Sequence, residues 1–289
     1  MGLRLKFNLV LLVVFLLGLG VTGYISYDLL HKNAREEVLR NAGVMMEAAL
    51  SMRGYTVAQV GPLLPYDPDK FHPQAVPAYA ATEIMAQLRK KYPAYTYKEA
   101  ALNPTNPRNR AVEWETDIVN SFRNNPETGE LSGRRETPTG PSLYLARPFQ
   151  IKNKACLACH TTAEMAPASM VRIYGPNNGF GWKHMEVIGA QIVSVPMDLP
   201  IRNANRAFYT FMGSLSVVFV ALFIILNVMM SVLIVRPITR MSKAADAIST
   251  GNMEIAEFSE TGGDEVALLR KSFNRMRRSL EKAIELIEK

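Results

Sequence analysis

Two long uncharged runs constrain this 289-residue chain more than any other feature. Phe7–Tyr27 holds 21 residues without a charge, and Ala207–Val235 holds 29. A helix needs roughly 20 predominantly apolar residues to cross a bilayer, so both runs predict membrane-spanning helices. The apolar part of the first run exceeds the roughly 7–15 residues of a signal-peptide core, which favours an uncleaved anchor over a removed signal.

Lysine and arginine residues near the ends of the runs predict the orientation of the chain. Arg4 and Lys6 precede the first run and Arg236 follows the second, whereas Arg202 and Arg206 at the opposite ends reduce the bias. The remaining bias predicts cytoplasmic termini in a bacterial inner membrane, with the segment between the runs in the periplasm.

The runs divide the chain into five expected parts. These are a cytoplasmic N-terminus (1–6), a first transmembrane helix (7–27), an extracytoplasmic domain (28–206), a second transmembrane helix (207–235) and a cytoplasmic helical domain (236–289). Part of the net charge of +7 comes from residues that flank the two predicted membrane spans. The sequence has no basic stripe interleaved with aromatic residues, so we do not expect nucleic acid as a partner. We expect no enzymatic activity, because the sequence shows no hydrolytic triad in an interpretable context and no phosphate loop.

The segment after the second run contains two heptad patterns separated by a connector. The first pattern follows Pro237, which a helix tolerates in its first turn, and Gly251 is its predicted stop. Asp264 is a good N-cap for the second helix. The apolar positions of that helix are spaced alternately by three and four: Val266, Leu269, Phe273, Met276, Leu280, Ala283 and Ile287. A lone seam of this kind needs a partner helix.

Pro237, the two heptad patterns and "DEVALL" at 264–269 together resemble a HAMP domain. The resemblance implies a parallel homodimeric four-helix bundle that relays motion from a membrane span to an output module. The alternative is a juxtamembrane coiled coil that only dimerises the protein. If the chain is the full gene product, we expect its output to be a separate cytoplasmic protein or a membrane complex.

The patterns between the runs predict an α+β domain with the outline of a PAS-like or Cache-like sensor. In the third helix, Val112, Ile118, Val119 and Phe122 are predicted to point inward. The predicted elements are helices at 32–60, 76–93 and 110–125, a strand at 94–102, a hairpin formed by 129–135 and 141–151, and strands at 169–175 and 186–197.

The only two cysteines, Cys156 and Cys159, lie three residues apart and are followed directly by His160. A disulfide between them would close a very short loop and constrain the unfolded chain little. A thioredoxin-like redox pair would need the motif to open a helix after a strand. A zinc site would need further ligands, and only His31, His72 and His184 remain.

The fourth interpretation is covalent haem, because Cys-x-x-Cys-His is the attachment signature of c-type haem. Cys156 and Cys159 would bond the two vinyl groups, and His160 would ligate the iron from the proximal side. Bacteria attach this cofactor outside the cytoplasmic membrane, where the charge bias places the loop. We therefore predict one covalently bound haem c.

Several longer segments resemble one known family, the c-type-haem sensor domain found ahead of HAMP-containing receptors and histidine kinases. The resemblance covers most of residues 45–200 and implies a PAS-like fold, one covalent haem, and sensing of redox state or of a small ligand such as a diatomic gas. The segments that carry it are "VPAYAA", "YPAYTYKEAALNPTNPRNRA", "CLACH", "YGPNNGFGW" and "VIGAQIVSVPM".

The sixth iron position would be open, which suits a gas sensor, or filled by a side chain, which suits a redox sensor or an electron carrier. Met52 on the first outer helix is a candidate ligand, although methionines on helices more often fill gaps in a core. Arg53 and Tyr55 are candidates to meet a haem propionate or a bound ligand. His184 and His72 are the alternative sixth ligands.

These features favour a membrane-bound haem sensor that relays redox state or ligand binding through HAMP to a separate partner. One alternative is a membrane-anchored electron-transfer cytochrome, which would not need a HAMP-like tail. Another is a cytochrome subunit of a larger membrane complex that uses the tail for assembly.

Overall fold

The chain folds into two compact units, which are described one at a time. One unit spans residues 25–208, and the other joins the chain up to Tyr24 with the chain from Tyr209 onward. The computed structural model describes residues 2–64, 67 and 69–287. The ends of the predicted terminal parts, residues 1 and 288–289, lie outside the described residues, as does the side chain of Ile287.

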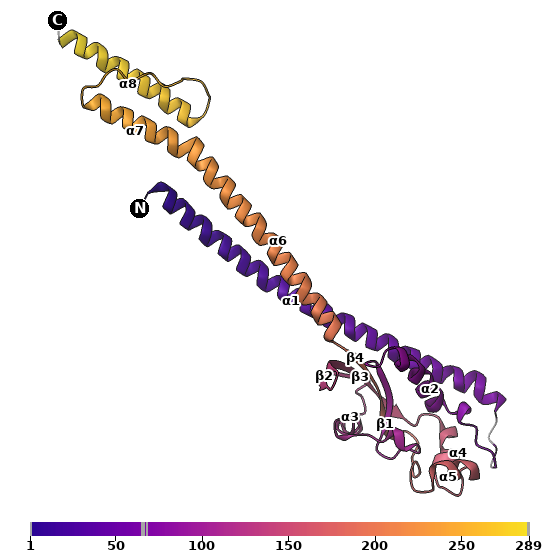
Figure 1. Cartoon of the computed structure of the whole chain (residues 1–289). Coiled ribbons are helices and arrows are strands. Elements are labelled where there is room, and N and C mark those ends of the chain that lie inside the picture. Colours follow the sequence, from indigo (N-terminus) through magenta and orange to yellow (C-terminus); the bar gives the residue numbers. More distant parts are fainter. Residues whose placement is uncertain (1, 65–66, 68, 288–289) are drawn as a thin grey trace. The chain divides into compact units, whose positions relative to one another are not determined.

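Residues 25–208 are built around a four-stranded antiparallel sheet with the strand order β1-β4-β3-β2 (Figure 1). Thr137 of β2 lies opposite Gly140 of β3, so these two strands form the predicted hairpin. The predicted combination of helices with an antiparallel sheet is confirmed. The strands are β1 (Thr96–Ala101), β2 (Leu131–Thr137), β3 (Gly140–Gln150) and β4 (Val187–Pro196).

One face of the sheet packs against α1 (Leu3–Tyr55). Side chains alternate between the two faces of a strand, so every second residue of β3 and β4 faces this helix. The outer part of α1 contributes a stripe of buried residues at helical spacing. This core consists of Val38, Ala42 and Met46 from α1, Leu143 and Leu145 from β3, Val193 and Val195 from β4, and Met197.

The opposite face packs against α3 (Glu113–Asn124). Ile118, Val119 and Phe122 are buried there as predicted, against alternate residues of β4 that include Ala190 and Ile192. Burying a large apolar side chain stabilises a fold by about 1.5–3 kcal/mol, so these contacts anchor the helix. The prediction for Val112 was wrong: it precedes the helix as its N-cap residue and stays 50% exposed.

The predicted strand at 169–175 was also wrong, because this segment forms the short helix α5 (Ala168–Tyr174). Within this helix Met170 is buried, whereas Ile173 is 59% exposed. Gly175, with a φ of +83°, ends the helix in a conformation that favours glycine. The remaining helices of this unit are α2 (Pro77–Lys91) and α4 (Leu157–His160).

Among the residues that the structure describes, two helices are long and apolar enough to cross a membrane, as the uncharged runs predict. The first is α1, with its continuation to Leu63; the second begins with α6 (Asp198–Met230) and continues to Ser249. Within the unit that contains both apolar segments, the rings of Phe15 and Phe219 stack with their centroids 4.7 Å apart. The other apolar residues of these two segments are largely exposed, which suits helices that face lipid.

The second long helix continues past Pro237. After α6 the chain passes through a π-helical turn at Ser231–Val235 and then directly into α7 (Arg236–Ser249). Such a turn is one of the recognised ways in which a helix accommodates a local break in its hydrogen-bond ladder. Gly251 then stops the helix with a φ of +91°, as predicted.

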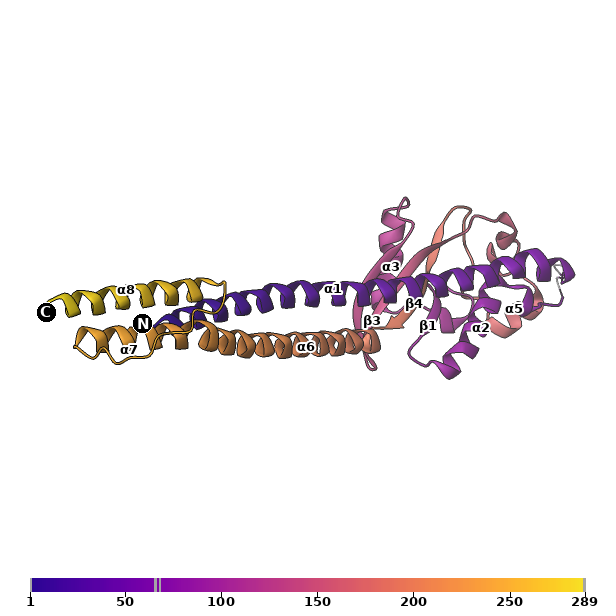
Figure 2. The same cartoon turned by 90° about the horizontal axis from the view of Figure 1, so that it is seen from above.

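The last helix, α8 (Glu265–Ile287), runs beside α7 in both views (Figures 1 and 2). Its predicted N-cap is confirmed, since Asp264 accepts a 2.7 Å hydrogen bond from the Ala267 amide. The buried Asn274 side chain bonds both the amide and the carbonyl of Phe258, which fastens the connector to α8.

Candidate cofactor site

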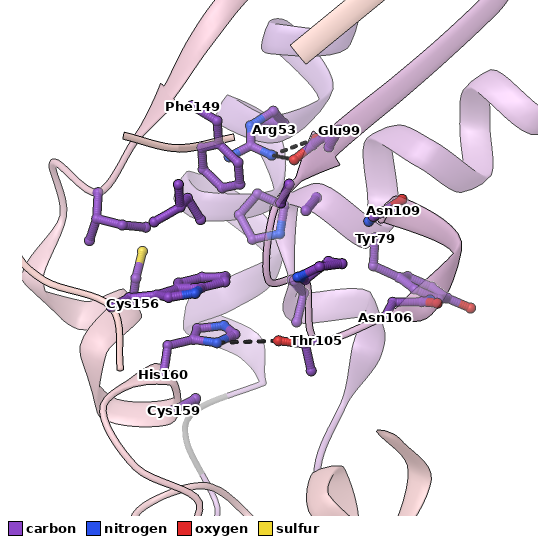
Figure 3. Close-up of a pocket in the computed structure, with 18 of the residues that line it drawn as sticks. Arg53, Tyr79, Glu99, Thr105, Asn106, Asn109, Phe149, Cys156, Cys159 and His160 are labelled. Atoms are coloured by element: carbon purple, nitrogen blue, oxygen red, sulfur yellow. Dashed lines mark hydrogen bonds and ion pairs between the residues drawn. The ribbon is translucent and has the colours of Figure 1, made fainter. Parts of the chain in front are cut away.

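A cavity of about 390 Å³ opens between α1, α2 and the loops beyond the sheet (Figure 3). Its volume falls within the roughly 300–1,000 Å³ that is usual for cofactor and ligand sites, and most of its lining is apolar. Cys156, Cys159 and His160 all line it, together with Arg53. The structure therefore brings four of the residues selected from the sequence to one site.

Cys156 and Cys159 are half-buried on one wall of the cavity. A 3₁₀ turn at Lys154–Cys156 leads directly into α4, and Asn153 caps the turn by accepting a 2.9 Å hydrogen bond from the Ala155 amide. Burial raises the pKa of both thiols, although the charge of Arg53 acts in the opposite direction at Cys156. Raised values are the opposite of the low thiol pKa that makes a redox cysteine reactive.

The His160 imidazole is held in one orientation by its neighbours. Its Nδ1 donates to the Gly179 carbonyl at 2.7 Å, and its ring stacks on Trp182 with the centroids 3.9 Å apart. Burial lowers the pKa of His160 and so favours the neutral ring. Because the hydrogen bond to the carbonyl keeps the proton on Nδ1, Nε2 of the neutral ring has a free lone pair and can act as a metal ligand.

Two loops far apart in sequence hold the backbone that orients His160. Asn103 accepts a 3.1 Å hydrogen bond from the Gly179 amide and donates a 3.2 Å bond to the Phe180 carbonyl. Gly179 has a φ of +82°, and a Cβ atom there would lie 2.0 Å from Thr105 Oγ1, so only glycine fits. We did not predict roles for Asn103, Thr105 or Gly179, although all three lie in two of the segments that carry the family resemblance, "YPAYTYKEAALNPTNPRNRA" and "YGPNNGFGW".

The wall across from His160 carries a buried ion pair (Figure 3). Arg53 Nη1 lies 2.6 and 2.5 Å from the two carboxylate oxygens of Glu99, which is only 2% exposed. Tyr97 Oη donates a 2.7 Å hydrogen bond to the same carboxylate, and the guanidinium lies 4.7 Å from the centroid of the Phe149 ring. Burial, followed by the nearby Glu99 charge, raises the pKa of Tyr97 well above its usual value.

A third part of the lining is polar and lies across the cavity from Cys156 (Figure 3). We call this set the polar rim: Tyr79, Asn106, Arg108 and Asn109. Arg108 lies over the Tyr79 ring at 5.6 Å and pairs with Glu83 at 2.6 Å. The Asn106 side chain accepts a 3.1 Å hydrogen bond from the Arg108 amide, which fixes the turn that presents these groups.

The other predicted site residues lie outside this cavity. Met52 and Tyr55 line a separate hollow between α1 and α2, and Tyr55 is 64% exposed. Adjacent helical residues are rotated by about 100°, so Arg53 faces the cavity while Met52 faces away from it. On this geometry Met52 is not placed to share an iron with His160.

The remaining histidines are also absent from the cavity lining. The exposed His184 bonds the Lys152 carbonyl at 3.2 Å, and His31 bonds the Tyr27 carbonyl at 2.9 Å. His72 does not line the cavity either. Within the part of the chain that the structure describes, no three His, Cys, Asp or Glu residues are grouped to hold a metal ion.

Comparisons with known proteins give two family matches. The family model described as Tll0287-like matches residues 31–196, and the model of the HAMP domain matches residues 229–282. Among solved structures, the crystal structure of the cyanobacterial heme protein Tll0287 matches with a TM-score of 0.45 and 16% sequence identity, over 55% of this chain and 95% of that one. No curated protein matches the chain.

Proposed function

Because the chain belongs to the Tll0287-like family and carries a HAMP domain, we propose that it is a membrane-bound sensor with one covalently attached haem c in a PAS-like domain. The observation that carries the proposal is the convergence of Cys156, Cys159 and His160 on one largely apolar cavity. The family takes its name from Tll0287, which is described as a cyanobacterial heme protein.

The residues of the cavity fit this cofactor chemically. Cys156 and Cys159 would bond the two vinyl groups, and His160 would ligate the iron through Nε2. The propionates of haem lie on the ring edge opposite its vinyl groups, so the amides and the guanidinium of the polar rim suit them. When bound, haem supplies an iron that can change oxidation state or take a ligand.

The chain's own residues set the conditions at that iron. The Gly179 carbonyl keeps His160 in the tautomer that leaves Nε2 free, and Trp182 holds the ring in place. The apolar lining limits water at the site, which strengthens every charge interaction inside it. The charge of Arg53, whose countercharge Glu99 is buried, acts on Cys156 within this lining.

The backbone connects this site to both apolar helices. Only Met197 separates β4 from α6, and Arg53 belongs to α1, so both apolar helices connect directly to elements of the sensor domain. We propose that a change at the iron alters these elements and that HAMP passes the change to a separate cytoplasmic partner. The mechanism requires the signal to have different affinities for two states of the domain.

A second copy of the chain is the expected partner of α8. The apolar seam of α8 remains substantially exposed beside α7, since Leu269 is 47% exposed and Leu280 is 41% exposed. HAMP domains typically act in dimeric receptors, so a parallel homodimer would cover this seam. The proposed location is the bacterial inner membrane, with the sensor domain in the periplasm and both termini in the cytoplasm. We also propose that the protein has no enzymatic activity of its own.

Crosslinking in membranes tests the relay. In the full-length Leu280→Cys variant, we expect a bismaleimide to join two copies and the yield to change when ascorbate reduces the haem. The control Ser279→Cys lies beside the seam and should crosslink weakly in both states. Crosslinking of Leu280→Cys that is independent of haem oxidation state would contradict the relay, and absence of crosslinking would contradict the dimer.

A further inference from the structure

The wall across the cavity from His160 presents a cation that still has hydrogen-bond donors to offer. Among the described residues, both hydrogen bonds of the Arg53 guanidinium are made through Nη1, and both go to Glu99. An arginine has five N–H donors, so those on Nε and Nη2 remain available. The Arg53 side chain lines the cavity and keeps 17% of its surface exposed.

We propose that this wall is a binding site for a small inorganic anion, which would occupy the iron position opposite His160 and accept hydrogen bonds from Arg53. The inference rests on the proposed haem and goes beyond it by assigning the class of ligand. Cyanide, azide and nitrite belong to this class: they can bond an iron through one atom and keep an acceptor or negative charge for the guanidinium.

Arg53 is not suited to the two other roles that a haem pocket offers. Guanidinium stays protonated in proteins and has no acceptor atom, so it cannot ligate iron. Arg53 lies with Glu99 and Phe149 on the wall across from His160, whereas the polar rim lies across the cavity from Cys156 (Figure 3). The propionates would lie on the ring edge opposite the thiols, beside the polar rim.

Glu99 sets the strength of the proposed site. The carboxylate lies beside the guanidinium (Figure 3) and both residues line the cavity, but the Glu99 side chain is only 1% exposed whereas that of Arg53 is 17% exposed. The Tyr97 hydroxyl donates to the carboxylate and helps keep it in place. Removing the negative charge of Glu99 should therefore leave Arg53 uncompensated and increase its attraction for an anion.

One lining residue competes with this assignment. Met170 is buried, lines the same cavity and carries a thioether that can bond haem iron. If Met170 filled the sixth position of the iron, the iron would not bind anions, whichever residue occupied position 53. Anion binding by the unmodified protein is therefore the first outcome to examine.

The test uses the full chain in detergent, with the haem content of every preparation measured before titration. Cyanide and azide are titrated against the ferric protein, and carbon monoxide, a poor hydrogen-bond acceptor, against the ferrous protein. Arg53→Leu should weaken anion binding by about 10- to 100-fold, the loss expected for a hydrogen bond from a charged donor, and change carbon monoxide binding by less than about threefold.

Three further variants complete the design. Glu99→Gln keeps an acceptor for Arg53 and should tighten anion binding several-fold, in the direction opposite to Arg53→Leu. Arg53→Lys should recover part of the lost affinity. Arg147→Leu is the matched control, because Arg147 also pairs with α1, through Glu47, but does not line the cavity. If Arg53→Leu fails to fold because Glu99 is left unpaired, the double variant Arg53→Leu/Glu99→Leu takes its place.

The outcomes separate the two proposals. If the unmodified protein contains no haem, the proposed function fails and this inference fails with it. If the protein contains haem but takes neither anion, or if Arg53→Leu and its double variant bind anions as tightly as the unmodified protein, only the inference is overturned. Opposite shifts in Arg53→Leu and Glu99→Gln, with carbon monoxide affinity unchanged, would establish the site.

Discussion

The two walls of the cavity are built in different ways. The His160 wall consists of short turns and loops, with three chemically essential residues inside five consecutive positions. The Arg53 wall consists of a long helix and the strand β1, and its central ion pair joins residues 46 positions apart. The comparison indicates that the proposed attachment chemistry depends on local spacing, whereas the electrostatics of the pocket depend on the tertiary fold.

The largest effect is expected on the His160 wall. The double variant Cys156→Ser/Cys159→Ser removes both sulfur atoms that would bond the cofactor, so we expect no haem to remain on the denatured chain. Haem staining after denaturing electrophoresis measures this. Arg53→Leu, on the other wall, should keep its covalent haem; loss of stain from Arg53→Leu, or stain that persists in the double variant, would contradict the division of roles.

The next largest effect concerns the stability of the Arg53 wall. Replacing Arg53 by leucine leaves the buried Glu99 carboxylate without its countercharge, which should cost about 3–5 kcal/mol of unfolding free energy. Arg53→Leu/Glu99→Leu removes both charges and should recover most of that loss. Denaturant unfolding of the sensor domain in the full chain, followed by circular dichroism, measures the difference.

An exposed ion pair provides the control for that measurement. Arg134 and Glu136 lie 2.8 Å apart with most of both side chains in solvent, so Arg134→Leu should cost no more than about 1 kcal/mol. A double variant at positions 53 and 99 that is as unstable as Arg53→Leu would show that burial of the charge is not the cause.

A smaller effect is expected where the loops support His160. Gly179→Ala places a Cβ atom against Thr105 at a positive φ and should destabilise the domain by about 1–3 kcal/mol. Gly175→Ala is the matched control, because Gly175 has a similar φ of +83° while no atom lies within 4 Å of the added Cβ. Equal melting temperatures for the two variants would mean that the Thr105 contact does not matter.

The smallest effect depends on pH. The half-buried Tyr97 keeps its proton at pH values where the unfolded chain loses it, because its pKa is raised in the folded state, so its contribution to stability is complete below pH 10 and declines above that value. Tyr97→Phe should cost about 1 kcal/mol at pH 7 through the lost hydrogen bond. Above pH 10 that deficit should shrink by about 1.4 kcal/mol per pH unit and then reverse, as measured by unfolding at several pH values. A deficit that is independent of pH would contradict the half-buried, protonated phenol.

Regular patterns were enough to predict most of the fold. The strand pattern at 186–197 matches β4, and the amphipathic pattern at 110–125 matches α3. The strand prediction for residues 169–175 was wrong because a short apolar run has no distinguishable period. The segment forms a helix whose Met170 is buried and lines the cavity, a tertiary contact that the local pattern does not reveal.

Only the part of the site that is contiguous in the sequence could be predicted. Cys156, Cys159 and His160 form a contiguous motif, and the structure places them together. Met52 and Arg53 could not be ranked from the sequence, because which of two neighbouring helical residues faces the cavity depends on how α1 rotates against the sheet. The partners Glu99 and Gly179 lie on other elements, and no spacing rule links them to the residues that they hold.

The most direct measurement is an absorption spectrum of the purified full chain, oxidised and dithionite-reduced, followed by acid–acetone extraction. The account predicts a c-type spectrum that stays with the protein after extraction and disappears in Cys156→Ser/Cys159→Ser. A protein without haem, or one whose haem is removed by the solvent, would contradict covalent attachment at this cavity.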